Sequence, residues 1–138
     1  CACAHLDACV DPVALLLPKA SKRVLEIAAL WGGCMYFLVC VAQLCGKPNP
    51  ITQSRVVSAE YEYAFSLGKQ RIKALHTPGH APHHITWIYG NEAFVGDSAG
   101  LWYPDLDKSF PVTPGYYRHD LALESIEKMN SLKLDFIF

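Results

Sequence analysis

Residues 76–84 read His-Thr-Pro-Gly-His-Ala-Pro-His-His, so four of nine consecutive side chains are imidazoles. Two prolines stiffen this stretch, and short runs of branched and aromatic residues flank it, which predicts a rigid loop between two strands. Imidazole is the commonest protein ligand for metal ions near neutral pH. The same composition also fits loop and strand-end histidines that share no partner. The geometry of the neighbouring strands must therefore decide between a metal site and an ordinary loop.

The segments on either side of this loop have the pattern of β-hairpins. Each hairpin has a two-residue turn that begins with glycine, which is a typical hairpin turn. Two consecutive hairpins predict an antiparallel sheet. The predicted strands are residues 61–67, 70–75, 85–89 and 92–95, with turns at Gly68-Lys69 and Gly90-Asn91.

The second turn sets the register of the strands that it joins. If Gly90-Asn91 is the turn, Tyr89 lies opposite Glu92 and, further along, His84 lies opposite Asp97. The 76–84 loop and Asp97 would then emerge at the same edge of the sheet. A histidine and a carboxylate that converge at one edge predict a metal site there.

The C-terminal part divides into an irregular segment and a helix. Residues 100–115 contain three prolines, which predicts a long surface loop without regular structure. Asp120 is a good N-cap, and the apolar residues that follow it recur at helical spacing. We therefore expect a helix over residues 121–130 that packs on the sheet through Ala122, Ile126 and Met129.

Composition and charge limit the classes of function. A chain of 138 residues, 51% hydrophobic and 18% charged, is long enough for one core, so we expect residues 1–138 to form a single domain. The formal net charge is -1 and no run of basic residues is present, which argues against nucleic acid as a partner.

The six cysteines all lie within the first 45 residues. In the absence of a signal peptide, free thiols in the cytoplasm are expected. Residues 27–44 have Gln43 as their only strongly polar side chain, which meets the minimum pattern for a membrane-spanning helix. Gly32-Gly33 interrupts this run, so a buried helix is favoured and a membrane partner is not expected. Apolar spacing and the stop at Gly46 predict a helix over about residues 35–45.

Two motifs in the C-terminal part resemble those of a known superfamily. The string Leu-His-Thr-Pro-Gly-His at 75–80, then a strand, then Val-Gly-Asp at 95–97, resembles the second and third metal motifs of the metallo-β-lactamase superfamily. The resemblance covers about residues 55–138. It implies an α+β fold that forms part of an αββα sandwich, with a mostly antiparallel sheet and packed helices. It also implies that His80 ligates the first metal and that Asp97 bridges two metals.

The first metal motif of that family, His-x-His-x-Asp-His, resembles residues 3–8, Cys-Ala-His-Leu-Asp-Ala. His5 and Asp7 match, Cys3 replaces the first histidine, and Ala8 replaces the last. A cysteine thiolate can ligate zinc, whereas alanine provides no ligand. The resemblance therefore implies one ion at most, zinc or iron. The implied metal ligands are Cys3, His5, Asp7, His80 and Asp97, with Asp7 and Asp97 as the catalytic carboxylates.

Other parts of the family pattern have no counterpart in this chain. The strands that precede the first motif and the final metal histidine are absent, so we expect a truncated or degenerate member. Such a sheet would have an exposed apolar edge, through which copies of the chain are expected to associate.

The resemblance implies a metal-dependent hydrolase. A bound metal would activate water for attack on an ester, thioester or related bond of a small-molecule substrate, at an impaired or mononuclear site. The alternative is a catalytically silent fragment that acts as a structural or interaction module. A third hypothesis is an unrelated zinc protein built on Cys9, Cys34, Cys40 and Cys45. Their spacing lacks a Cys-x-x-Cys pair, which favours thiols in a core.

Overall fold

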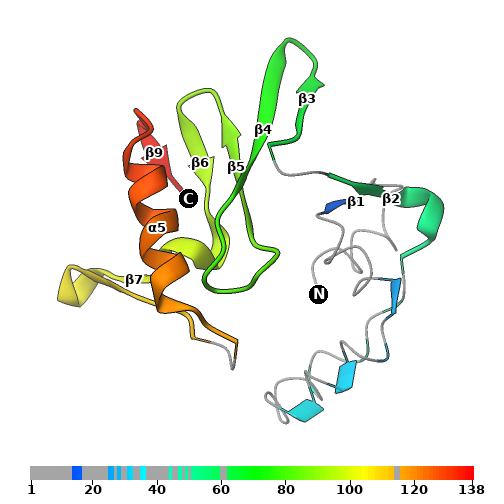
Figure 1. The fold of residues 1–138 in the computed structure, drawn as a ribbon, viewed down its shortest axis with the longest axis horizontal. Helices are drawn as coiled ribbons and strands as arrows, with labels where there is room; N and C mark the ends of the chain where they lie inside the picture. Colours follow the sequence, from blue (N-terminus) through cyan, green and yellow to red (C-terminus); the bar gives the residue numbers. More distant parts are fainter. Residues whose placement is uncertain are drawn as a thin grey trace. The chain divides into compact units, whose positions relative to one another are not determined.

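The structure is a computed structural model of the chain. It describes residues 14–16, isolated positions between 25 and 49, and residues 51–59, 62–113 and 116–138. The chain divides into two compact units, Cys1–Ala59 and Glu60–Phe138, which are described separately (Figure 1). The expectation of one domain over residues 1–138 stays a prediction.

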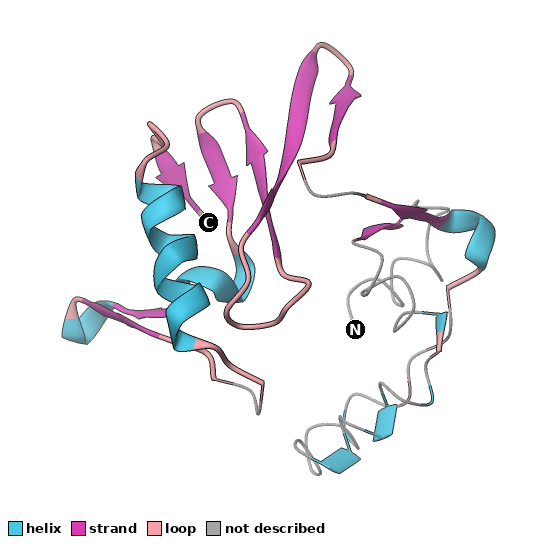
Figure 2. Ribbon diagram, viewed as in Figure 1, coloured by secondary structure: helices cyan, strands magenta, loops and turns pink. Residues whose placement is uncertain are grey.

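The first unit contains a small parallel sheet (Figure 2). Strand β1 (Ala14–Leu16) pairs with β2 (Val56–Ser58), and the short 3-10 helix η1 (Gln53–Arg55) leads into β2. Most of the helix predicted over residues 35–45 lies outside the described residues, although Met35, Tyr36 and Leu44 are helical. In the part of the chain that the structure describes, no helix is long and apolar enough to cross a membrane. Most of residues 27–44 lie outside the described residues.

The second unit is built around a five-stranded sheet with the order β3-β4-β5-β6-β9 (Figures 1 and 2). All neighbouring strands are antiparallel except β6 and β9, which are parallel. Both glycine turns occur where they were predicted, because the strands end at residues 67 and 89 and resume at residues 70 and 92. The strands are β3 (Ala64–Leu67), β4 (Gln70–His76), β5 (Ile85–Tyr89), β6 (Glu92–Phe94) and β9 (Phe136–Ile137).

The predicted register is correct near the turn and wrong further along the hairpin. Tyr89 pairs with Glu92 as predicted, but the ladder ends at the pair Trp87 and Phe94. The 3-10 helix η2 (Gly96–Ala99) follows, and Gly96 has a φ of 50°, which turns the backbone out of the strand. His84 and Asp97 are therefore not a strand pair. Asp97 lies instead in the first turn of η2.

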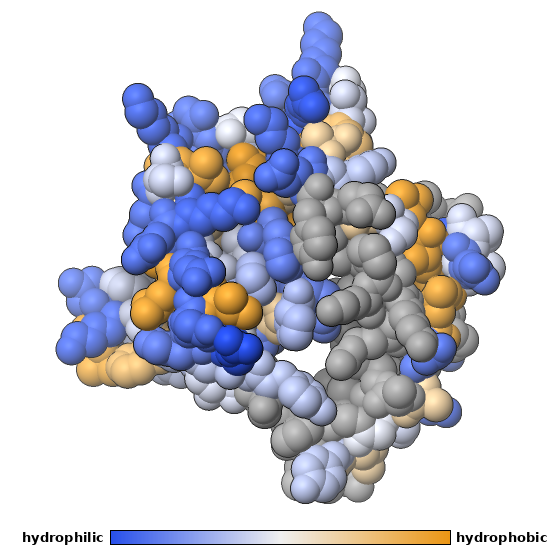
Figure 3. Space-filling view, in the orientation of Figure 1, coloured by the Kyte–Doolittle hydropathy of each residue, from blue (hydrophilic) through white to orange (hydrophobic). Residues whose placement is uncertain are grey.

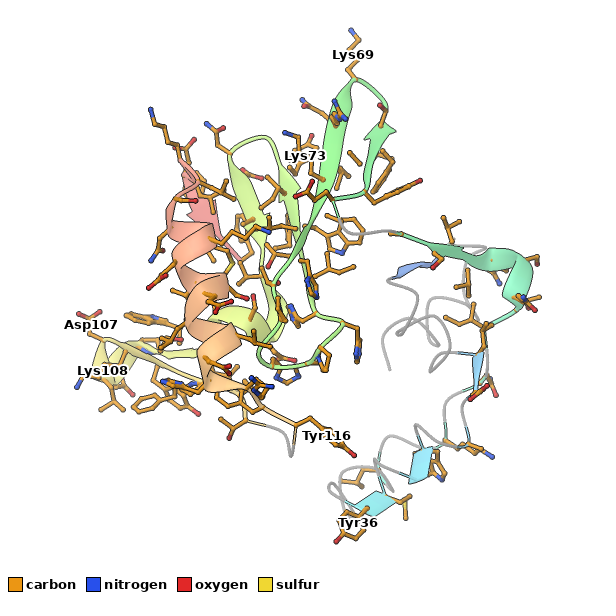
Figure 4. The ribbon with its side chains drawn as sticks, viewed as in Figure 1. Tyr36, Lys69, Lys73, Asp107, Lys108 and Tyr116 are labelled. Atoms are coloured by element: carbon orange, nitrogen blue, oxygen red, sulfur yellow. The ribbon has the colours of Figure 1, made fainter. Side chains whose placement is uncertain are left out.

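The segment predicted as an irregular loop forms a second small antiparallel sheet, so that prediction was wrong. Strand β7 (Leu101–Tyr103) pairs with β8 (Lys108–Phe110) across the 3-10 helix η3 (Pro104–Leu106). The prolines are accommodated because Pro104 begins η3 and Pro111 follows β8 directly. Figure 4 labels Asp107 and Lys108 at the tip of this hairpin.

One helix, α5 (His119–Asn130), packs on this sheet. It begins two residues before the predicted start, with Arg118 at the N-cap, so the assignment of Asp120 as N-cap was wrong. Asp120 lies in the first turn, where its carboxylate oxygen Oδ2 is 2.6 Å from the Arg118 guanidinium nitrogen Nη2. The hydrogen bonds from Arg118 lower the pKa of Asp120.

The core of this unit lies between α5 and the sheet. Met129 of α5 packs against Ala93 and Val95, and all three side chains are buried. On the face shown in Figure 3, hydrophilic side chains dominate the second unit and apolar groups form separate patches. The combination of a mixed, mostly antiparallel sheet with a packed helix confirms the predicted α+β class.

Candidate metal-binding site

The loop between β4 and β5 is closed by its own backbone and attached to α5. The amide of Thr77 donates to the carbonyl of His84 at 3.1 Å, which closes the loop at its base. At the far end, the amide of Arg118 donates to the carbonyl of Gly79 at 2.9 Å, and the Ser125 hydroxyl donates to the carbonyl of Pro78 at 2.6 Å. These three contacts fix the backbone on both sides of His80.

Gly79 allows a close approach between this loop and the helix. An ideal Cβ built on Gly79 would lie 2.5 Å from the Cα of Ala122, and the φ of Gly79 is 139°. No L side chain fits this position without a backbone shift. The glycine of the Thr-Pro-Gly-His string therefore has a packing role, which is to let the loop lie directly on α5.

The imidazole of His80 contacts two partners through its two ring nitrogens. Its Nδ1 lies 3.0 Å from the carbonyl oxygen of Val112. Because a carbonyl can only accept, Nδ1 carries the proton of this hydrogen bond. The other nitrogen, Nε2, lies 3.3 Å from the carboxylate oxygen Oδ2 of Asp97. The His80 side chain is 19% exposed and that of Asp97 is 51% exposed, so the pair is open to solvent on the carboxylate side.

This arrangement favours a positive charge between the two side chains. With the His80 proton on Nδ1, a neutral ring directs the lone pair of Nε2 toward a carboxylate that can also only accept. Two acceptors at 3.3 Å repel each other unless a cation lies between them or Nε2 is protonated. A metal ion or a second proton on His80 satisfies the geometry equally well.

A second histidine of the loop lies beside this pair. The ring of His84 meets the ring of His80 edge to face, with 5.9 Å between the ring centroids. The pKa of His84 is lowered to about 4, first by burial and then by the neighbouring His80, with a smaller opposing effect of Asp97. His84 is therefore neutral near pH 7.

Three buried hydroxyl groups connect His84 to the core. The Thr77 hydroxyl lies 3.0 Å from His84 Nδ1 and 3.0 Å from the Thr86 hydroxyl. The Thr86 hydroxyl lies 3.3 Å from that of Ser98, which donates to the carbonyl of Val95 at 2.7 Å. Thr77 and Thr86 are fully buried. We call the series Ser98, Thr86 and Thr77 the hydroxyl chain.

The structure describes two of the five side chains expected as metal ligands. It brings His80 and Asp97 together, whereas Cys3, His5 and Asp7 lie outside the described residues. Among the residues that the structure does describe, no group of three or more His, Cys, Asp or Glu side chains is arranged to hold a metal ion. The ligand roles of all five residues stay predictions.

The groups that orient the two histidines were not predicted from the sequence. The carbonyl of Val112, which accepts from His80, lies in the segment that was expected to be a surface loop. The hydroxyl chain was not foreseen either, although Thr86 left a signal. It is the polar residue of an otherwise apolar and aromatic strand and is fully buried, and a buried polar residue normally has a hydrogen-bond partner.

Comparison with known proteins gives both a sequence relative and structural relatives. The metallo-beta-lactamase fold-containing protein ST1585 of Sulfurisphaera tokodaii is 32% identical over 88 residues, which are 64% of this chain and 33% of that protein. A crystal structure of ST1585 from Sulfolobus tokodaii, described as an archaeal metallo-beta-lactamase superfamily protein, superposes with a TM-score of 0.85. That superposition has 24% identity and covers 96% of this chain and 53% of that chain.

The chain has a metallo-β-lactamase fold. A second solved structure has the same fold. MEM-A1, a subclass B3 metallo-beta-lactamase from a soil metagenome library, superposes with a TM-score of 0.59 at 17% identity. The superposition covers 98% of this chain and 51% of MEM-A1. No family model matches the chain. The resemblance drawn from the residues around His80 and Asp97 is therefore confirmed at the level of the fold. The aligned part spans 33% of the curated relative and about half of the structural relatives.

Proposed function

We propose that this metallo-β-lactamase-fold chain forms part of a metal-dependent hydrolase site that acts on an ester, thioester or related bond of a small molecule. His80 and Asp97 are two of its metal ligands. The proposal depends above all on the 3.3 Å contact between His80 Nε2 and Asp97 Oδ2.

This distance suits two ligands of one ion. Zinc binds histidine nitrogen and carboxylate oxygen at about 2.1 Å, so two such ligands at a tetrahedral angle lie roughly 3.4 Å apart. The hydrogen bond from His80 Nδ1 to the Val112 carbonyl adds a second argument. Histidine ligands usually donate their other ring N–H in this way, which orients the ring and raises the basicity of the ligating nitrogen.

The described residues supply two donors, and a stable zinc site needs three or four. His5, Asp7 and Cys3 are the proposed source of the others, because the resemblance aligns them with the first metal motif. Ala8 leaves the second metal of that motif one ligand short. We therefore propose one zinc or iron ion per chain.

When bound, such an ion would lower the pKa of water toward neutrality and polarise the bond to be cleaved. The residues of this chain have separate tasks. His80 is held by the Val112 carbonyl so that Nε2 faces the site, and Asp97 supplies negative charge on the solvent-exposed side. Asp7 would orient the attacking water or accept its proton.

Metal binding provides the direct test. The purified chain should be stripped with a chelator, titrated with zinc against a chromophoric competitor, and analysed for metal content. We expect one ion per chain. His80→Ala should abolish binding, and Asp97→Asn should weaken it about 10- to 100-fold. His119→Ala is the matched control, since His119 is exposed at the start of α5 and should leave binding unchanged.

Hydrolysis should then be measured with zinc-loaded protein on an aryl ester, a thioester, a β-lactam and a phosphodiester. Turnover of an ester or thioester that is lost in His80→Ala supports the proposal. Two tightly bound ions would contradict the mononuclear site. Binding without turnover of any of the four substrates would contradict the hydrolase.

The competing proposal is a structural or interaction module without activity. One observation favours it: strand β9 lies at the end of the sheet order, and its residues Phe136 and Ile137 are 61% and 53% exposed. An exposed apolar edge strand invites pairing with another strand. If zinc does not bind and sedimentation shows dimers or larger species, the module is the better account.

A further inference from the structure

The proton positions in the hydroxyl chain can be deduced from its hydrogen bonds. Each hydroxyl has one proton to donate and can accept two. The Ser98 hydroxyl lies 2.7 Å from the Val95 carbonyl, so its single proton points there. The Thr86 proton then points to Ser98 Oγ at 3.3 Å or to Met129 Sδ at 3.6 Å, both of which can only accept from it.

The same count continues to the imidazole. Because the Thr86 proton is used toward Ser98 or Met129, the 3.0 Å contact between Thr77 and Thr86 needs the proton of Thr77. The 3.0 Å contact between Thr77 and His84 Nδ1 then needs a proton on the ring nitrogen. The opposite polarity, with Thr77 donating to His84, would leave the contact between Thr86 and Ser98 as two facing lone pairs. Unpaired polar atoms are costly in a buried position.

The far side of the His84 ring lies next to the site. An ideal Cβ on Gly96 would be 3.3 Å from His84 Nε2, and Gly96 directly precedes Asp97. The ring also contacts that of His80 edge to face. Nε2 is the ring nitrogen of His84 that the hydroxyl chain does not contact. It therefore lies on the edge of the ring that borders Gly96, beside the pair of His80 and Asp97.

We propose that the hydroxyl chain fixes the proton of His84 on Nδ1 and thereby keeps Nε2 as a hydrogen-bond acceptor in the site of His80 and Asp97. His84 is then a positioning residue, and its ligand is a hydrogen-bond donor: a water molecule or an N–H or O–H group of a substrate. This role for Nε2 rests on the proposed function, whereas the position of the proton does not.

The test uses the whole 138-residue chain, free of metal, with 15N-labelled histidine. Two-bond proton–nitrogen correlations at pH 7 distinguish the two tautomers of each ring, and the His84→Asn variant assigns the signals of His84. We expect the Nδ1–H form of His84 in an excess of about tenfold or more, the ratio that about 1.4 kcal/mol supports. A dominant Nε2–H form, or an even mixture, would overturn the proposal.

Two buried serines provide a matched pair of variants. Ser98→Ala removes the start of the hydroxyl chain and leaves the Thr86 proton only the weaker thioether acceptor of Met129. This proton then turns more often to Thr77, and the excess of the Nδ1–H form should fall several-fold. Ser125→Ala removes the hydroxyl of another buried serine, which donates to the carbonyl of Pro78 on the same loop, and the excess should stay unchanged. Thr86→Val repeats the test if Ser98→Ala does not fold. An unchanged excess in folded Ser98→Ala or Thr86→Val would contradict the chain as its cause.

The two proposals fail independently. The tautomer is measured without metal and without substrate, so an Nε2–H form of His84 would leave the proposed hydrolase intact. Conversely, a chain that binds no zinc and cleaves no substrate can still have His84 in the Nδ1–H form.

Discussion

The 76–84 loop with Thr86 and the β7–β8 hairpin are neighbours in the chain but are stabilised differently. We call the loop together with Thr86 the junction, because it connects the sheet to α5. At the junction, Thr77 and Thr86 are fully buried, and their partners lie 7 to 43 residues away in sequence. In the hairpin, Trp102 and Tyr103 are 57% and 46% exposed, and the strands pair residues that are 5 to 9 positions apart. The site is thus held by contacts between distant segments, whereas the hairpin is a local structure with its side chains in solvent.

This difference predicts where substitutions matter. A change at the junction affects the loop, the sheet and α5 together, because Pro78, Gly79 and Thr86 contact residues of the helix or its start. A change in the hairpin removes little buried surface. The largest losses of stability should therefore fall close to the candidate site.

Gly79→Ala should have the largest effect. The new Cβ would overlap the backbone of Ala122 at 2.5 Å, and the φ of 139° is unfavourable for alanine. We expect the free energy of unfolding to fall by about 3–5 kcal/mol, from backbone strain and overpacking combined. Urea unfolding measures this loss directly.

Gly68→Ala is the control for that substitution. Gly68 has a φ of 60° in the β3–β4 turn, but no atom lies within 4 Å of its ideal Cβ. Its replacement should cost roughly 1–2 kcal/mol, from the left-handed conformation alone. Equal losses for the two alanine variants would contradict the close contact between the loop and α5. In Figure 4, the neighbouring Lys69 marks this turn at the tip of the hairpin.

Met129→Ala should have the next largest effect. Met129 is 3% exposed, packs against Ala93 and Val95, and also contacts the Thr86 hydroxyl through its sulfur at 3.6 Å. Loss of this buried side chain should cost about 2–5 kcal/mol in thermal or urea unfolding. Leu123→Ala on the same helix is the control, since Leu123 is 48% exposed, and about 0.5 kcal/mol is expected there. A similar loss of unfolding free energy in both variants would contradict the assignment of Met129 to the core.

The pH dependence of the free energy of unfolding should show that His84 is partly buried. Burial lowers its pKa from the ordinary 6.5 to about 4; His80, His83 and His76 add to this effect and Asp97 opposes it. Between these two pH values the unfolded chain binds more protons than the folded chain, so stability increases with pH. The contribution of His84 should be complete above about pH 6.5 and decline as the pH falls toward 4.

The measurement compares the wild type with His84→Asn by urea unfolding at several pH values. The asparagine variant should lose less stability between pH 6.5 and pH 4 than the wild type. Parallel pH profiles for the two proteins would show that His84 titrates normally and is not desolvated.

Trp102→Ala should have the smallest effect. The side chain is 57% exposed on a two-stranded sheet, so its removal should change the free energy of unfolding by no more than about 0.5 kcal/mol. Thermal unfolding with and without the substitution tests this. A loss comparable to that of Met129→Ala would mean that the hairpin is as closely integrated as the junction.

The predictions that succeeded depend on local patterns. Glycine in the first position of two-residue turns located both hairpins, and the apolar spacing located α5 within two residues. The predictions that failed depend on how far strands pair beyond a turn, which a local pattern does not determine. The register of the second hairpin could not be extended to Asp97, because Gly96 turns the chain away after β6.

The segment after Asp97 failed for a related reason. Three prolines suggested an irregular loop, yet Pro104 and Pro111 lie just outside the strands that pair. Proline forbids a strand only where its missing amide is needed. Which amides are needed depends on the partner strand, and that information is not present in the segment itself.

The sequence by itself determined the two hairpins and the juxtaposition of the 76–84 loop with Asp97, because turns and strand alternation act over short distances. The resemblance of its motifs also indicated the fold. Strand pairing had placed His84 opposite Asp97, whereas the resemblance had paired His80 with it. Only the tertiary structure decided between the two and set how each ring is oriented. His80, rather than His84, contacts the carboxylate, and its orientation depends on the carbonyl of Val112, 32 residues away. A hydrogen bond between distant segments leaves no periodic signal in a sequence, since it requires only that the chain pass within about 3 Å.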